Sequence, residues 1–383
     1  MKKIVGWSPS VQLPITLHRF SLTTPSMTFG KEPAKSEEIP KTQKAAVFTE
    51  HGGEIKIQEI PVPEIGVDDV LVKVLYSGVC GTDLHVWRGD LPVKGKDFPI
   101  VGGHEGIGIV VKVGQNVTNF KVGDRAGIKW INSSCLSCSE CIHSYEQNCP
   151  NAMLSGLTRD GSFQQYAVVC GNIAAKIPED ADLKGCAPVL CAGVTAYKAL
   201  LEANIKAGEI IAIVGAGGGL GTMAIQYARA MGYRPLAIDG SSKEKLCKEM
   251  GAEWFIDHKT ENLVSEIRKL TKGGPHAVMC LAPIEKAMNQ ACEYVRTRGT
   301  VVLVALPKDA RVSIDVFSTV FRAITVKGSY VGNREDTVEA IEFFSRGLIK
   351  IPVEIQPLSQ LPNVFDRMHK GEINGRIVLD LWN

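Results

Sequence analysis

A short apolar run followed by clustered glycines constrains the fold more than any other stretch of this 383-residue chain. Residues 210–214 are wholly apolar and mostly β-branched, as a parallel strand buried on both faces requires. Residues 215–221 read GAGGGLG, and the apolar spacing of residues 222–231 predicts a helix. Residues 235–238 are the next expected strand, which ends at Asp239. This order of strand, glycine turn, helix, strand and acid predicts a dinucleotide-binding α/β unit.

The glycine turn predicts the cofactor. It reads G-x-x-G-x-x-G, one residue longer than the strict G-x-G-x-x-G pattern. Glycine turns alone often bind nothing, but the flanking strand, helix and acid favour a pyrophosphate site at the helix N-terminus. Asp239 would accept from ribose hydroxyls and repel a 2′-phosphate, which favours NAD over NADP. The candidate contacts in the turn are Gly215, Gly218, Gly219, Leu220 and Gly221.

Further strands are predicted on both sides of this unit. Residues 254–256, 277–281, 300–305 and 324–326 alternate with helical spacers, which fits a six-stranded, doubly wound sheet. Earlier in the chain, short Val-containing runs bounded by Gly, Pro and Asp predict a compact β-rich domain. These runs are residues 44–48, 69–74 and 107–113.

Four of the eleven cysteines lie close together in the sequence: Cys135, Cys138, Cys141 and Cys149. The C-x-x-C-x-x-C spacing with one further cysteine suits a closed structural zinc site. An iron–sulfur cluster is the competing interpretation, because Pro150 follows the last cysteine as in ferredoxins. The longer final spacing favours zinc.

Three separated residues predict an open catalytic zinc site, with three protein ligands and one free position. Cys80 lies in residues 79–85 (VCGTDLH), His104 in residues 102–106 (GGHEG), and Cys191 much later in the chain. Taken singly, each is more often an ordinary buried residue. Their combination with the cysteine loop and the glycine turn favours metal binding.

Composition limits the remaining possibilities. The hydrophobic fraction of 45% and charged fraction of 22% are typical of a globular protein. A formal net charge of +2 indicates no nucleic-acid partner, and no apolar run is long enough to cross a membrane. Closely spaced cysteines favour a reducing compartment such as the cytoplasm. Residues 1–42 are expected to be disordered; they resemble a weak mitochondrial presequence, or Met27 is the true start.

Together these motifs resemble the zinc-dependent medium-chain alcohol dehydrogenases, and most closely the fungal-type, usually tetrameric branch. The resemblance covers roughly residues 40–383. The matching segments are residues 76–85, 102–106, the four-cysteine loop, 160–166, 190–200, 226–233 and 328–334.

The resemblance implies an α/β architecture with a GroES-like catalytic domain and a Rossmann nucleotide-binding domain. After the extension at 1–42, the catalytic domain would span residues 43–192 and 330–383, with the nucleotide domain at 193–329. It also implies two zinc ions per subunit, an alcohol or aldehyde substrate, and a homotetramer.

The resemblance also implies roles for individual residues. A proton path would run from the Thr82 hydroxyl, through a cofactor ribose hydroxyl, to His85 and solvent. Asp83 would orient His104, and Glu105 would lie behind the metal and take part in ligand exchange. Two further residues match family contacts to the cofactor, although each is also readable as an ordinary solvated charge: Lys243 near the ribose and Arg376 at the pyrophosphate.

Two positions depart from the family pattern. Gly81 stands where relatives place a cation against the cofactor phosphate, so Gly81→His is expected to lower the KM for NAD. Leu91 replaces an aromatic wall of the alcohol pocket, which predicts a substrate bulkier than ethanol and a specialised pathway. The other expected pocket residues are Trp87, Trp130 and Leu306.

Two alternative functions to a dehydrogenase of bulkier alcohols remain: a housekeeping ethanol dehydrogenase and a catalytically silent NAD-binding protein. Zinc-free reductases are disfavoured because both cysteine sets are present.

Overall fold

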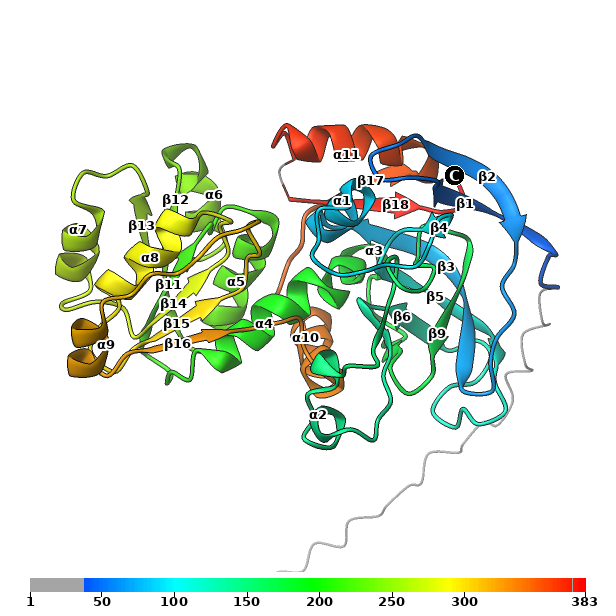
Figure 1. The fold of residues 1–383 in the computed structure, drawn as a ribbon, viewed down its shortest axis with the longest axis horizontal. Coiled ribbons are helices and arrows are strands. Elements are labelled where there is room, and N and C mark those ends of the chain that lie inside the picture. Colours follow the sequence, from blue (N-terminus) through cyan, green and yellow to red (C-terminus); the bar gives the residue numbers. More distant parts are fainter. Residues whose placement is uncertain (1–37, 374) are drawn as a thin grey trace, which may run out of the picture. The chain divides into compact units, whose positions relative to one another are not determined.

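The structure, a computed structural model, describes residues 38–373 and 375–383 (Figure 1). Of the extension expected at 1–42, residues 1–37 lie outside the described part. The expectation of disorder is wrong for the last residues of that segment. Ile39 packs against a hydrophobic cluster, the Lys41 carbonyl accepts from the Val62 amide, and the first strand begins at Thr42.

The six-stranded parallel sheet predicted from the sequence is confirmed. Its order is β13 (Trp254–Asp257), β12 (Arg234–Asp239), β11 (Ile210–Val214), β14 (Ala277–Cys280), β15 (Thr300–Leu303) and β16 (Thr325–Gly328). The direction of strand order reverses between β11 and β14, the kind of position at which open α/β sheets bind ligands at their carboxyl edge.

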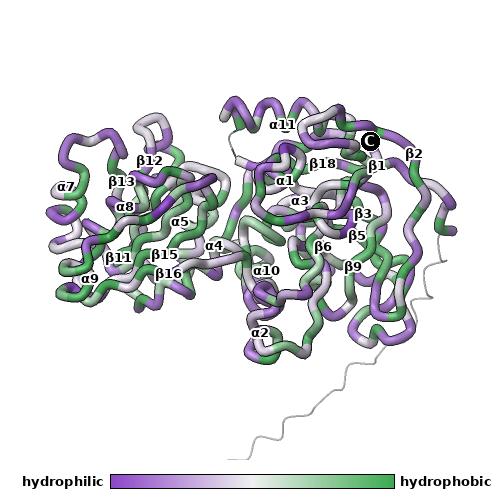
Figure 2. Tube along the Cα trace, in the orientation of Figure 1, coloured by the Kyte–Doolittle hydropathy of each residue, from purple (hydrophilic) through white to green (hydrophobic). Residues whose placement is uncertain are grey.

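Alternate residues of these strands pack on opposite faces of the sheet. Ile211 and Ile213 of β11 face α4 (Ala192–Glu202), α5 (Gly219–Ala230) and α6 (Glu244–Glu249). Ile210, Ala212 and Val214 instead face α7 (Leu263–Leu270) and α8 (Glu285–Tyr294). Both faces of β11 are therefore buried, which explains its wholly apolar sequence. Figure 2 shows hydrophobic residues running along β11 and its neighbours.

The β-rich part contains a seven-stranded sheet to which the chain returns at its C-terminus. Its order is β10 (Ala175–Lys176), β6 (Arg125–Ile128), β5 (Glu105–Val113), β3 (Asp69–Val79), β18 (Arg376–Asp380) and β17 (Val353–Pro357), with β9 (Tyr166–Cys170) also paired to β3. A three-stranded sheet contains β2 (Ile55–Pro61), β1 (Thr42–Phe48) and β4 (Ile100–Val101), and β7 (Ile131–Ser133) pairs with β8 (Met153–Leu154). The α/β architecture expected from the sequence, with a β-rich part and a Rossmann-like parallel sheet, is confirmed.

The remaining helices connect or cover these sheets. They are α1 (Gly81–Arg88), α2 (Ser139–Ile142), α3 (Leu183–Cys186), α9 (Val316–Arg322), α10 (Arg334–Ser345) and α11 (Leu361–His369), with short 3-10 turns at Glu146–Asn148, Ala187–Leu190, Ser241–Lys243 and Leu358–Gln360. Within the described part of the chain, no helix has the length and apolarity that a membrane span needs.

Candidate active site

The pairing of β3 with β5 brings the first two predicted zinc ligands together. The two strands are antiparallel, and Gly78 near the end of β3 lies opposite Glu105 at the start of β5. Cys80 follows β3 as the N-cap of α1, and His104 immediately precedes β5. Two segments that are 24 residues apart in the sequence therefore meet at one end of the strand pair.

Cys191 completes this group, which we call the mixed cluster: Cys80, His104, Glu105 and Cys191. Cys191 lies at the N-terminus of α4, with its Sγ 3.2 Å from His104 Nε2 and 3.9 Å from Cys80 Sγ. One ligand atom from each residue lies within 4.8 Å of all the others, and all four residues are buried. The bond to the Cys191 thiol lowers the pKa of Cys80 well below its ordinary value despite burial, which favours the thiolate that binds metals.

Asp83 fixes the orientation of His104. Its Oδ1 lies 2.6 Å from His104 Nδ1, and its Oδ2 accepts from the Cys80 amide at 2.9 Å. Nδ1 is thereby occupied, so Nε2 is the imidazole nitrogen that faces the thiols. A carboxylate behind an imidazole is the common arrangement around zinc-binding histidines.

Glu105 has one paired and one free carboxylate oxygen. Its Oε1 accepts from Arg376 at 2.5 Å, whereas its buried Oε2 has no hydrogen-bond partner among the described residues. A Cβ on Gly78 would come within 1.9 Å of Oε2, so this close approach requires glycine. Burial raises the pKa of Glu105 to about 7, although Arg376 opposes the shift. An orphaned buried oxygen beside two thiols and an imidazole suits a cation.

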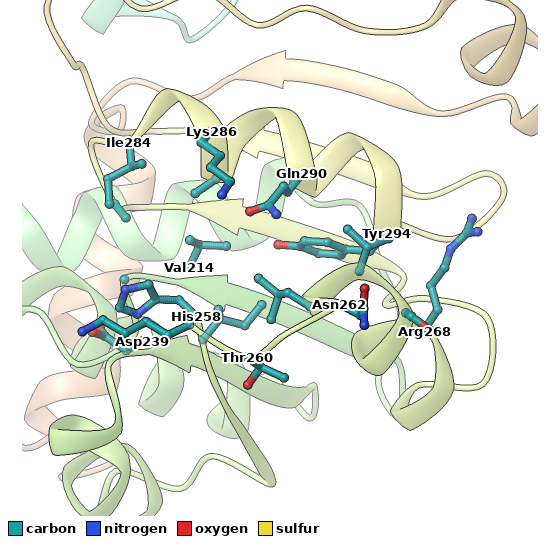
Figure 3. A pocket seen from close by; sticks show the side chains of 18 of the residues that line it. Val214, Asp239, His258, Thr260, Asn262, Arg268, Ile284, Lys286, Gln290 and Tyr294 are labelled. Atoms are coloured by element: carbon teal, nitrogen blue, oxygen red, sulfur yellow. The ribbon is translucent and has the colours of Figure 1, made fainter.

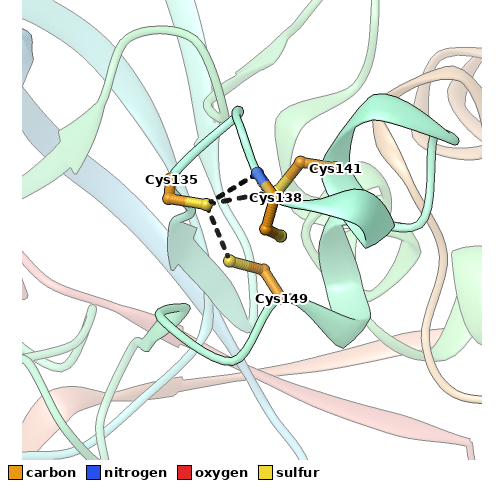
Figure 4. Close-up of side chains that lie close together, drawn as sticks. All are labelled: Cys135, Cys138, Cys141 and Cys149. Carbon is orange, nitrogen blue, oxygen red and sulfur yellow. Dashed lines mark hydrogen bonds between the residues drawn. The ribbon is translucent and has the colours of Figure 1, made fainter.

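The second group, the four-cysteine cluster, is built from a single loop (Figure 4). Cys135 Sγ lies 3.5 Å from Cys149 Sγ and 4.0 Å from Cys141 Sγ, and it accepts from the Cys138 amide at 3.3 Å. Backbone hydrogen bonds from Ser137 and Cys138 lower the pKa of Cys135 to about 5. Four converging sulfurs match a closed zinc site.

A crevice of about 1220 Å³ opens at the carboxyl edge of the parallel sheet. Figure 3 shows Val214 and Asp239 at one end and Tyr294 and Arg268 at the other. Gly215 lines the crevice with φ of +82°, a conformation that favours glycine. Asp239 accepts from the Gly217 amide at 2.8 Å and the Gly240 amide at 2.7 Å.

At the start of α5, glycines allow a pyrophosphate to come close to the backbone. A Cβ on Gly221 would meet the Gly215 carbonyl oxygen at 2.3 Å, and one on Gly217 would meet Lys243 Cβ at 2.6 Å. A cavity of about 180 Å³ is lined by Gly219 and Arg376. Arg376 is only 8% exposed, so it is not an ordinary solvated charge. These features fit a dinucleotide.

The proposed proton path lies on α1. Thr82 Oγ1 is 3.8 Å from Cys80 Sγ, at the edge of the mixed cluster. One turn later, His85 is half exposed, and its Nδ1 lies 2.7 Å from Asp90 Oδ1. The two side chains thus span from the buried cluster to solvent.

Two of the expected pocket residues lie together beside the mixed cluster. The Trp130 ring lies edge-on to His104 with centroids 5.1 Å apart, and Leu91 packs in the same hydrophobic group. Tyr330, which sequence reasoning missed, bonds to Trp130 Nε1 through its hydroxyl; its place in the matching segment 328–334 was the available signal.

The structure places the other two expected pocket residues elsewhere. Trp87 packs on Phe365, with centroids 5.7 Å apart, and donates to the Gly53 carbonyl. Successive residues of a helix point about 100° apart, so when Val86 faces the Trp130 group Trp87 faces away. Leu306 is 77% exposed.

Comparisons with known proteins agree with this geometry. The family described as alcohol dehydrogenase GroES-like domain matches residues 66–179, and the family described as zinc-binding dehydrogenase matches residues 219–346. The chain is 53% identical over 347 residues to alcohol dehydrogenase 1 of Neurospora crassa, covering 90% of this chain and 98% of that protein.

Two solved structures share the fold. The alcohol dehydrogenase of Aeropyrum pernix has a TM-score of 0.81 at 28% identity, covering 88% of this chain and 100% of the other. The acetophenone reductase of Geotrichum candidum in complex with NAD has a TM-score of 0.79 at 28% identity, covering 90% and 99%. The chain therefore belongs to the zinc-binding medium-chain alcohol dehydrogenases, oxidoreductases that act on CH–OH groups with NAD.

Proposed function

We propose that this enzyme interconverts primary alcohols bulkier than ethanol with their aldehydes, using NAD and a zinc ion in the mixed cluster. The observation that carries the site assignment is the free Oε2 of Glu105 beside Cys80, His104 and Cys191. These three residues would hold the zinc, with Glu105 as an exchangeable fourth donor. The four-cysteine cluster would hold a structural zinc. When bound, zinc supplies a Lewis acid for the alcohol oxygen, and NAD accepts the hydride.

The chain's own residues would bind the cofactor and move the proton. The glycine turn and Arg376 would hold the pyrophosphate, and Asp239 and Lys243 the adenosine ribose. The Thr82 hydroxyl would take the alcohol proton while passing its own proton onward, and His85 would release a proton to solvent, which its 50% exposed side chain permits. Arg376 would also favour the ionised form of Glu105 through their ion pair, against the opposing effect of burial.

The substrate assignment rests on the wall beside the zinc ligands. Leu91 packs against the Trp130 group with less bulk than an aromatic side chain would have there. A change of this size discriminates between substrates by about 1–3 kcal/mol. A bulkier substrate would suit a specialised pathway. A housekeeping ethanol dehydrogenase is the second candidate, and the similarity to alcohol dehydrogenase 1 of Neurospora crassa supports the alcohol dehydrogenase activity that both candidates share.

The test is NADH formation by zinc-replete enzyme on alcohols from ethanol to branched and aromatic members. We expect kcat/KM to be higher for the bulkier alcohols in the wild type. Leu91→Trp should lower that preference by about tenfold. A preference for ethanol that Leu91→Trp leaves unchanged would contradict the larger pocket but not the dehydrogenase activity.

We further propose that the chain forms a homotetramer in which a second copy covers α9. Four apolar residues there are over 70% exposed: Val316, Phe317, Val320 and Phe321. Such a patch is unusual on a monomer, and β16 is an edge strand whose backbone a second copy can pair with. Phe317→Glu should lower the mass measured by light scattering, whereas Val338→Glu, at a site 57% exposed on α10, should not.

Two smaller assignments complete the proposal. The catalytic domain would span residues 43–192 and 330–383 around a nucleotide domain at 193–329, a division that the position of β17 and β18 in the seven-stranded sheet supports. None of the eleven cysteines, all of which lie among the described residues, is in a disulfide, which supports a reducing compartment such as the cytoplasm.

A further inference from the structure

A short segment that is neither helix nor strand joins β16 to α10, and we call its residues 330–333 the strap. Trp130 Nε1 donates to the Tyr330 hydroxyl, and Val331 packs in the same hydrophobic group as Trp130. The Trp130 ring in turn lies edge-on to His104. The strap therefore lies one layer of side chains away from the mixed cluster.

The backbone of the strap has a conformation that its own sequence does not favour. Val331 has a φ of +40°, in the left-handed region, where a β-branched residue is a rare outlier. The next residue, Gly332, lies tightly against α4, because a Cβ there would come within 2.5 Å of Val194 Cγ2. Strained residues persist only where the surrounding structure holds them. Contacts outside the strap must therefore keep it in place.

The four-cysteine loop, residues 135–149, supplies two of these contacts. Glu146 is buried, and its Oε1 accepts from the backbone amide of Arg334 at 2.7 Å and from the side-chain Nε at 3.0 Å. Asn333 Nδ2 donates to the Ser144 carbonyl at 2.9 Å, and Asn333 is also the N-cap of α10. The C-terminal end of the strap is thus bound to the loop that contains the four cysteines.

A buried lysine connects the same helix to the Trp130 segment. Lys129 immediately precedes Trp130, and its Nζ donates to Thr337 Oγ1 in the first turn of α10 at 3.1 Å. Removing the partner of a buried charge is strongly destabilising. The start of α10 is therefore held on one side by the four-cysteine loop and on the other by the residue next to Trp130.

We propose that the four-cysteine loop positions one wall of the alcohol site, with Glu146 as the positioning residue. Glu146 holds the start of α10, α10 holds the strap, and the strap holds Trp130 against His104. The proposal rests on the proposed function, because it takes the layer around Trp130 as part of the alcohol site. It gives the loop a role besides stability, which is to keep the KM for the alcohol low without taking part in the chemical step.

The first test removes the acceptor for Arg334. Glu146→Ala should raise the KM for ethanol about fivefold and change kcat less than about twofold, the pattern of a lost binding contribution. Glu146→Gln keeps an oxygen for both Arg334 donors, and the Arg334 side chain is 48% exposed, so water can solvate its charge. This conservative variant should keep the wild-type KM.

Glu253→Ala is the matched control. Glu253 also accepts two N–H groups from one arginine, at 2.9 and 2.5 Å from Arg234, but this pair lies at the amino end of β12, opposite the edge that faces the cofactor crevice. Both alanine variants should lower the Tm, and only Glu146→Ala should raise the KM. Two zinc ions per chain, measured by atomic absorption, identify the intact enzyme in each case.

Asn333→Ser keeps the test decisive if Glu146→Ala does not fold. Serine caps a helix about as well as asparagine, so this variant loses only the donor to the Ser144 carbonyl. It should raise the KM for ethanol about threefold at unchanged kcat.

Three results would overturn the inference: an unchanged KM in folded Glu146→Ala, an equal rise in Glu253→Ala, or, where Glu146→Ala does not fold, an unchanged KM in Asn333→Ser. Each would leave the proposed function intact. A wild type that turns over no alcohol with NAD would overturn both.

Discussion

The two metal clusters are assembled in different ways. The four-cysteine cluster takes all its donors from residues 135–149, and two of its cysteines are partly exposed. The mixed cluster takes its donors from the end of β3, the start of β5 and the start of α4, and all of them are buried. A local loop with little apolar surface needs a metal to fold, whereas a site built by sheet pairing is positioned by the fold itself. We infer that the first cluster stabilises the protein and the second performs chemistry.

The largest expected effect is on activity at the mixed cluster. Cys191→Ser should remove the zinc bound there and lower kcat/KM at least ~10³-fold, or about 4 kcal/mol of transition-state stabilisation. The bound zinc, measured by atomic absorption, should fall from two ions per chain to one. The fold should persist, because β3, β5 and α4 are held by their own pairing and packing.

Cys170→Ser is the matched control for that experiment. Cys170 is also a buried free cysteine, but it lies outside both clusters. It should retain two zinc ions and most of the activity. A Cys191→Ser protein with two zinc ions and full turnover would contradict the assignment of the mixed cluster.

The next largest effect is expected on thermal stability, from a change in the four-cysteine cluster. Cys149→Ser should also leave one zinc ion per chain, but its main consequence should be a Tm lower by about 5 °C or more, since structural zinc contributes directly to folding. The protein that remains folded should keep most of its kcat. If Cys149→Ser and Cys191→Ser lowered activity and Tm equally, the proposed division of roles would be wrong.

A smaller effect, on zinc affinity or activity, is expected from a change at Asp83. The four-cysteine cluster contains no histidine ligand for such a carboxylate to orient. Asp83→Asn removes the charge that orients His104 and should lower zinc affinity or activity by about 10–100-fold. Competition with a chelator measures the affinity. Asp90→Asn, which alters the exposed partner of His85, should leave zinc affinity unchanged.

The sequence predicts the local features best. The spacing of the four cysteines, the glycine turn and the apolar run of β11 are each read within one segment, and the structure has all three as expected. The strands of the parallel sheet were equally predictable, because burial on both faces leaves short apolar runs between helices.

Features that depend on contacts between residues far apart in the sequence were harder to predict. Glu105 reaches the ligand group only because Gly78 lies opposite it on the neighbouring strand. Its ion pair with Arg376 joins residues separated by 271 positions. The direction of Trp87 depends on which face of α1 meets Trp130, and one-dimensional spacing does not specify that choice.

The smallest expected effect is on cofactor affinity, at the residue that follows Cys80. Gly81 begins α1, and a Cβ built on it would meet nothing within 4 Å, so a larger side chain fits there. Arg376, the buried cation near the turn, already pairs with Glu105. Gly81→His should therefore add a phosphate contact and lower the Kd for NADH about fivefold, or about 1 kcal/mol.

Gly81→Ala separates this contact from the effect of stiffening the first turn of α1. Alanine fills part of the same open space without a polar group, so it should leave the Kd for NADH, followed by fluorescence, close to that of the wild type. A tighter Kd in both variants would assign the gain to the helix. A Kd unchanged in Gly81→His would mean that residue 81 faces no phosphate. In that case the two clusters would still differ in their metal chemistry. The start of α1 next to Cys80 would, however, play no part in cofactor binding.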